Sequence, residues 1–111
     1  MIRQLAQLRP SSTSAEVLFN PTENRPYTIY NIIITNTTGS TVSASIYHDE
    51  DGSTYDATTA ILESVPMIAN QTLHYEGKLY GYKAAGNIAV KTSTANALTF
   101  TAYGEIAGER L

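Results

Sequence analysis

The most charged run of the chain is HDEDGSTYD, residues 48–56, which sets three aspartates and a glutamate within eight residues of a histidine. Carboxylates and an imidazole at this density are groups that bind metal ions or move protons. An EF-hand loop needs oxygen ligands at positions 1, 3 and 5, glycine at 6 and glutamate at 12. With Gly52 at position 6, Tyr47 falls at position 1 and Thr58 at position 12, so two ligands are missing. The run is therefore not an EF-hand.

Two interpretations of this run remain. The Asp-Gly step supplies the positive φ of a tight turn between strands, and flanking carboxylates keep such a turn solvated. The alternative is a looser Ca²⁺ site built from Asp49, Asp51 and Asp56 with backbone carbonyls. We favour the turn and therefore expect no metal and no cofactor.

The remaining catalytic residue types do not form a pattern. His48 and His74 are the only imidazoles, and their spacing does not indicate the three or four converging ligands of a zinc site. The chain has no cysteine, no G-x-S-x-G elbow and no P-loop. Two carboxylates in one acidic turn both stay ionised, which disfavours glycoside hydrolysis. We expect a protein that is not an enzyme.

Tyrosine is the other conspicuous side chain, with eight Tyr against two Phe and no Trp. A large ring with a polar tip suits a protein interface or a sugar-binding platform. The stretch GKLYGYK, residues 77–83, is predicted to be a loop that exposes Tyr80 and Tyr82. Contact with protein is favoured, and a carbohydrate-binding module that uses exposed Tyr and the acidic loop is an alternative function.

Short segments with period-two alternation, separated by Gly, Pro and Asn turns, must position these side chains. This pattern predicts an all-β fold, a single antiparallel β-sandwich of about seven or eight strands, of which the jelly roll is one form. The expected strands are 16–19, 27–36, 41–49, 60–65, 71–77, 87–93 and 97–106. NTTGS, residues 36–40, is expected to close a hairpin, and the last two strands to pair as a meander. Pro66 predicts an edge strand or a crossover.

The N-terminal residues 1–14 are predicted to form an extended arm or an edge strand ahead of a sandwich domain at 15–111. Pro10 and the following Ser/Thr run stop a long helix. As an arm, the segment would carry Leu5 and Leu8 into an apolar slot on a neighbouring subunit, while Arg9 meets an acidic rim.

Charge and hydropathy exclude two classes of partner. The net charge is -3 and the basic residues are scattered, which argues against nucleic-acid binding. The longest strongly apolar stretch is residues 32–34, so no membrane partner is expected. Only 15% of residues are charged, well below the usual quarter. Low charge and abundant Tyr favour a surface that meets other protein.

Several segments resemble small structural proteins of tailed-bacteriophage virions. They are RQLAQLRP at 3–10, YTIYNIIITNTTGSTVSASIYHDEDGSTYDATTAIL at 27–62, VPMIANQTL at 65–73 and NIAVKTSTANALTFTAYGEI at 87–106. The resemblance implies a non-enzymatic β-sandwich built into the particle, and it transfers no catalytic residues.

The expected function is that of a structural virion component, with a capsid decoration or cement protein favoured and a neck or tail structural protein as the alternative. The implied partners are copies of the chain itself, a trimer among them, and virion proteins such as the major capsid protein. The implied location is the virion, after synthesis in the host cytoplasm. The predicted contact residues are Ile2, Leu5, Leu8, Arg9, Tyr30, Tyr47, Tyr80 and Tyr82.

Overall fold

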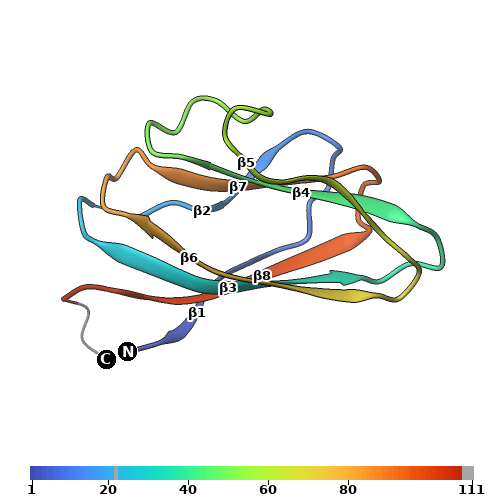
Figure 1. Ribbon diagram of the computed structural model, residues 1–111, viewed down its shortest axis with the longest axis horizontal. Helices are drawn as coiled ribbons and strands as arrows, with labels where there is room; N and C mark the ends of the chain where they lie inside the picture. The colour runs from blue at the N-terminus through green and yellow to red at the C-terminus, as the bar shows by residue number, and fades with distance from the viewer. Residues whose placement is uncertain (22, 109–111) are drawn as a thin grey trace.

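The computed structural model describes residues 1–21 and 23–108, and these residues form eight β-strands and no helix (Figure 1). The strands are β1 (Arg3–Leu8), β2 (Glu16–Phe19), β3 (Tyr27–Asn36), β4 (Val42–Asp49), β5 (Ala60–Met67), β6 (Thr72–Gly81), β7 (Asn87–Thr92) and β8 (Leu98–Ile106). The predicted all-β class is confirmed. In the described part of the chain, no helix is long and apolar enough to cross a membrane.

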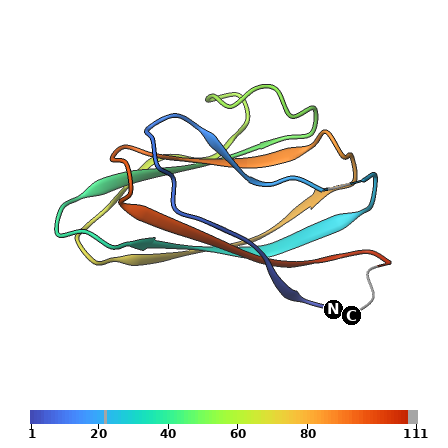
Figure 2. The same cartoon turned by 180° about the vertical axis from the view of Figure 1, so that it is seen from behind.

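The strands form two four-stranded antiparallel sheets that pack face to face, as Figures 1 and 2 show from opposite sides. Sheet A has the order β1-β8-β3-β6, and sheet B has the order β2-β7-β4-β5. The first strand pairs with the eighth, the second with the seventh, the third with the sixth and the fourth with the fifth. This is the pairing of one long hairpin rolled into two sheets, which is a jelly roll.

Two predicted connections are wrong. Residues 36–40 do not close a hairpin, because they carry the chain from β3 in sheet A to β4 in sheet B. β7 and β8 are not a meander, because they too lie in different sheets. Alternation shows which side chains face the core, but a strand with the correct face can join either sheet.

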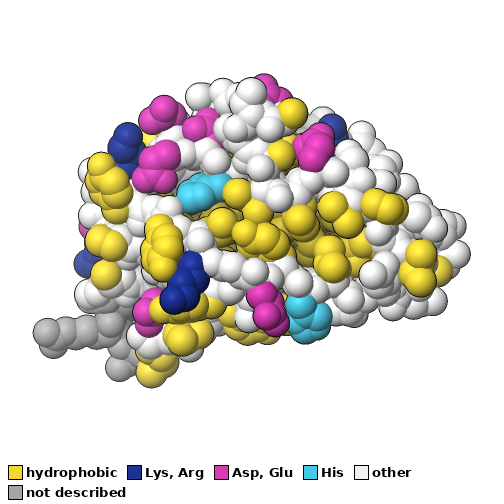
Figure 3. Space-filling model, viewed as in Figure 1, with side chains coloured by type: hydrophobic (Ala, Val, Ile, Leu, Met, Phe, Trp, Pro, Cys, Tyr) yellow, Lys and Arg dark blue, Asp and Glu magenta, His cyan; other side chains and the backbone are white. Residues whose placement is uncertain are grey.

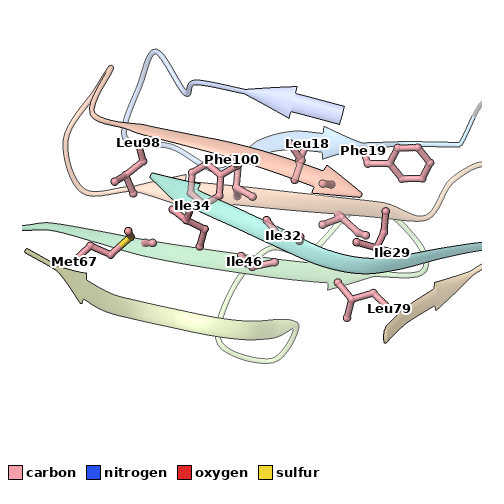
Figure 4. Close-up of a cluster of buried hydrophobic side chains, with 14 of the residues drawn as sticks. Leu18, Phe19, Ile29, Ile32, Ile34, Ile46, Met67, Leu79, Leu98 and Phe100 are labelled. Carbon is pink, nitrogen blue, oxygen red and sulfur yellow. The ribbon is translucent and has the colours of Figure 1, made fainter. Parts of the chain in front are cut away.

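The core lies between the inner faces of the two sheets (Figure 4). β3 supplies Ile29, Ile32 and Ile34 from sheet A, all fully buried, and they pack with Ile46 of β4 and Phe100 of β8. Ile33 points to the other face of β3 and is only partly buried. β3 is flanked by β8 and β6, so it is a central strand of sheet A.

The predicted loop at residues 77–83 is mostly strand. β6 continues to Gly81, and its Leu79–Gly81 part pairs with the start of β3. Gly81 has a packing role, because a Cβ at this position would overlap the ring of Tyr27, with its Cε1 only 2.7 Å away. Gly81, which resembles a turn signal in the sequence, is therefore needed because the buried Tyr27 ring packs directly against its Cα.

The N-terminal segment folds onto its own domain as an edge strand. β1 pairs with β8 from Arg3 opposite Gly104 to Leu8 opposite Phe100. Leu5 and Leu8, which were expected to fill a slot on a neighbour, are partly buried against this chain's own core. At the other side of the sandwich, Pro66 lies in the edge strand β5, as predicted.

We predict that Gly104→Ala destabilises the fold. Gly104 lies opposite Ile29 in β3, where an added Cβ would collide with the backbone carbonyl oxygen of Thr28 and come within 2.9 Å of the Ile29 Cα. Overpacking against backbone costs about 1–3 kcal/mol in the free energy of unfolding. Urea denaturation monitored by circular dichroism measures this change.

Gly39→Ala is the matched control, because nothing lies within 4 Å of a Cβ at that position. Its free energy of unfolding should stay within about 0.5 kcal/mol of the parent value. Equal destabilisation by the two substitutions would contradict the close approach of β8 and β3.

Candidate interaction surfaces

The acidic run forms a turn that is organised by one carboxylate. Asp49 ends β4, and its side chain accepts backbone N–H groups from Asp51 at 3.1 Å, Ser53 at 2.9 Å and Thr54 at 2.6 Å. These bonds, led by the one from Thr54, hold the pKa of Asp49 below its ordinary value. Gly52 has a φ of 70°, as the Asp-Gly turn predicts.

The other two aspartates considered as Ca²⁺ ligands have separate surroundings. Asp56 accepts the backbone N–H and the hydroxyl of Thr58, at 2.8 and 2.6 Å, and these bonds lower its pKa. Asp51 is exposed and lies 3.6 Å from the Lys83 ammonium. Among residues 1–21 and 23–108, no group of three or more His, Asp or Glu side chains is placed to hold a metal ion.

The loop after β4 is tied down by a buried amide. The Asn87 Nδ2 of β7 donates to the carbonyl of Gly52 at 3.2 Å and to the hydroxyl of Tyr55 at 2.6 Å. Asn87 is buried in the strand that neighbours β4, so the loop is fastened to sheet B. Nothing in the acidic run itself indicated this partner, which lies more than 30 residues away.

His48 is part of a contact between the two sheets. Its Nε2 lies 3.2 Å from the Tyr27 hydroxyl and 3.6 Å from a Glu50 carboxylate oxygen. Burial, reinforced by the charge of Glu50, raises the pKa of Tyr27 to about 12, and burial lowers the pKa of His48. We therefore assign the tyrosine as donor and a neutral imidazole as acceptor. The two histidines are not brought together, because His74 is exposed on β6 of sheet A.

Half of the predicted contact residues lie at one end of sheet A. At the end of the sheet where β3 begins, Glu105 lies opposite Thr28, and Thr28 lies opposite Tyr80. The exposed and half-exposed hydrophobic side chains on the outer side of this end are Ile2, Tyr30, Tyr80 and Tyr103. Tyr82 is also exposed and directly follows β6, where the chain leaves sheet A and its N–H donates to Glu50 Oε1. We call these five residues the tyrosine face. The chain segments that supply it are far apart in sequence, so only the register brings them together.

The tyrosine face has a fixed polar centre. The Tyr30 hydroxyl donates to Glu105 Oε1 at 2.8 Å, and the N-terminal ammonium of Met1 lies 3.7 Å from Oε2 of the same carboxylate. The hydrogen bond to Glu105 is the main reason that the pKa of Tyr30 is raised. Beside this centre is a hollow of about 310 Å³, lined in part by Pro26, Thr28 and Glu105.

The other predicted contact residues lie elsewhere. Tyr47 is only 1% exposed, so its prediction as a contact residue is wrong; its burial raises the pKa of its hydroxyl, which lies near Ser45 and Glu63. Leu5 and Leu8 pack on this chain's core, and the Arg9 guanidinium donates to the Asn96 carbonyl. Tyr103, which was not predicted as a contact, joins the tyrosine face through its place opposite Gln4 and Asn31.

A second apolar surface lies along one flank of the sandwich, between the edge strands β5 and β6. Figure 3 shows hydrophobic side chains in a continuous band between the two sheets. The partly buried residues of these strands that are larger than alanine are Ile61, Leu62 and Val65 of β5 and Leu73 and Tyr75 of β6. We call this surface the flank band.

Comparison of the chain with protein-family models, with curated proteins and with solved structures finds no match. The resemblance to phage virion proteins therefore stays a hypothesis.

We predict that the Asp49 carboxylate stabilises the loop without Ca²⁺. Asp49→Ala removes the acceptor of three backbone N–H groups and should lower the melting temperature by the same amount in Ca²⁺ and in chelator. Asp51→Ala removes only an exposed contact with Lys83 and should leave the melting temperature nearly unchanged. A rise in the parent's melting temperature on adding Ca²⁺, abolished in Asp49→Ala, would contradict this role.

We predict a stability change in mild acid that originates at His48. The pKa of His48 is lowered in the folded state from its ordinary value of about 6.5. Below pH 6.5 the unfolded state therefore binds more protons than the folded state, and the free energy of unfolding decreases as the pH is lowered. The loss ends near the folded pKa, and the lowered pKa values of Asp49 and Asp56 act in the same direction only below about pH 4. Urea denaturation between pH 7.5 and 5.5 measures the slope.

His48→Gln should flatten that slope, whereas His74→Gln, at an exposed position on β6, should leave it unchanged. If both variants keep the slope of the parent chain, the burial of His48 between the sheets is not the cause.

Proposed function

We propose that this chain is a structural component of a tailed-bacteriophage virion, best described as a capsid decoration or cement protein. It would act by binding the shell, with the major capsid protein as the partner, and no covalent bond would be made or broken. The observation that carries the proposal is the tyrosine face, where four predicted contact residues from three separate segments are exposed or half-exposed at one end of sheet A. A neck or tail position on the same particle is the alternative within this class.

The chemistry of the tyrosine face suits a protein partner. Ile2, Tyr80 and Tyr82 are 60%, 63% and 55% exposed, which is unusual for large hydrophobic side chains. Interface anchors are enriched in Tyr and surrounded by polar groups that are already satisfied, as the Tyr30–Glu105 pair is here. The adjacent hollow offers space for a side chain of the partner.

The fold agrees with this class by analogy only, because jelly rolls occur in viral capsid proteins and also in lectins. One observation favours the carbohydrate-binding alternative. Tyr80 and Tyr82 lie two residues apart at the end of β6 and are both exposed, so their rings can present neighbouring surfaces to a sugar chain. The experiment must therefore separate the two ligands.

We predict that Tyr80→Ala weakens co-sedimentation with empty capsids by about tenfold, the usual effect of truncating one interface anchor. Ile2→Ala should act in the same direction. Val17→Ala is the matched control, because Val17 is 44% exposed but belongs to β2 of sheet B. Folding of each variant is checked by its melting temperature.

The same variants are tested on a glycan array. Capsid binding that is lost in Tyr80→Ala and kept in Val17→Ala supports the decoration role. Glycan binding that disappears in Tyr80→Ala and Tyr82→Ala, with no capsid binding by the parent chain, would replace it with the carbohydrate-binding alternative.

A further inference from the structure

Along the flank band, only side chains fill the gap between sheet A and sheet B. β5 and β6 are the edge strands at the same side of their sheets, and no other strand among the described residues pairs with their outer edges. The half-buried residues that fill the gap between them include Leu62, Leu73 and Tyr75, and none of the band residues is charged. A continuous apolar surface on a small soluble domain marks a contact site.

Backbone pairing with another strand is blocked along this flank. β5 contains Pro66 and a Ser64 with a φ of 50°. In β6, Gly77 and Lys78 together stand opposite the single residue Tyr30 of β3, which interrupts the ladder at mid-strand. Such irregularities protect edges from strand addition. Whatever covers the band must therefore bind through side chains.

The side chains of β6 are self-complementary about Gly77. The sequence on either side is Tyr75-Glu76-Gly77-Lys78-Leu79, with the charged residues exposed and the hydrophobic residues facing inward. An antiparallel second β6 centred on the same glycine places each Glu76 beside the partner's lysine, while Leu79 stays buried in the core of its own chain. Within the described residues, neither Glu76 nor Lys78 has an ion pair of its own.

The charges at the two ends of the sandwich suit the same arrangement. Segments 34–43, 65–73 and 93–99, at the end where β3 finishes, contain no Lys, Arg, Asp or Glu. Arg9, which donates to the Asn96 carbonyl at this end, follows β1, at the opposite edge of sheet A from β6. Glu50, Asp51 and Lys83 lie at the opposite end, and Figure 3 shows the uncharged end at the right. An antiparallel arrangement sets the charged end of each copy against the uncharged end of the other, so like charges stay apart.

The size of the flank is sufficient. The view of Figures 1 and 3 is down the shortest axis, so the whole molecule, seen from the side that carries the flank band, has extents of 42 by 28 Å. A standard interface covers roughly 800 Å² on each partner, which is less than the area of this side.

We propose that the flank band binds a second copy of this chain across a two-fold axis that passes beside Gly77, so that Glu76 of each copy pairs with Lys78 of the other. The contact is isologous, because the same surface serves both copies. It does not rest on the proposed function, since it is tested on the pure protein, and it leaves most of the tyrosine face free for a different partner.

The experiment is a charge-swap cycle on the full chain, read by light scattering after size exclusion over a dilution series from about 0.1 mM downward, a range that covers micromolar affinities. The parent chain should show the mass of two 12.0 kDa chains. Glu76→Lys and Lys78→Glu should each weaken the dimer at least tenfold, because each sets like charges together twice. The double variant E76K/K78E should restore the dimer. All four proteins should keep similar melting temperatures, because both residues are exposed.

Lys91→Glu is the matched control, because it makes the same charge change as Lys78→Glu at an exposed position in β7. This variant should still show the mass of two chains in light scattering. A parent chain with the mass of one or of three chains would overturn the proposal. So would single variants that dimerise like the parent, or a folded double variant that stays monomeric. None of these results depends on capsid binding, so failure here leaves the proposed function standing, and the reverse also holds.

Discussion

The structure depends on one constraint, the packing of two sheets that share no strand pairing in the described part of the chain. Every strand ladder lies within sheet A or within sheet B, so the apolar layer between them carries the fold. Two polar contacts fix the layer at its ends. The buried Asn36 amide, at the end of β3, donates to the carbonyls of Ser40, Met67 and Ile68. At the other end, Tyr27 of β3 meets His48 of β4. Because unpaired polar groups are costly when buried, these contacts also set the register of the two sheets.

The strands themselves could be predicted, since period-two alternation with Gly, Pro and Asn punctuation is local information. Strand partners could not, because Ile32 and Ile34 would face a core equally well beside any neighbour. The extent of β6 was missed for a related reason. Gly81 is conformationally permissive, so it resembles a turn, and only the position of the Tyr27 ring explains it as a packing residue.

The candidate surfaces were predicted in part. The acidic run was correctly interpreted as a turn, since Asp-Gly chemistry is local, but its fastening by Asn87 depends on β7 lying next to β4. Tyr30, Tyr80 and Ile2 were predicted as contacts one by one, without any signal that they share a face. Tyr47 has the same residue type and strand context, yet it is buried. Exposure on a sheet is decided by what covers each face, which a single strand's sequence does not contain.

The pairing of β1 with β8 joins residues about a hundred positions apart, Arg3 with Gly104 among them. Such a contact closes a loop of about a hundred residues, and loop-closure entropy opposes it until other contacts are in place. During synthesis, β1 has no strand partner until β8 emerges from the ribosome. Sheet A therefore reaches its full width only after β8 has been translated, and until then the backbone N–H and C=O groups of β1 have no strand partner. A nascent chain of this topology exposes unpaired strands for longer than a helical bundle of the same length, so it depends more on chaperones to avoid aggregation.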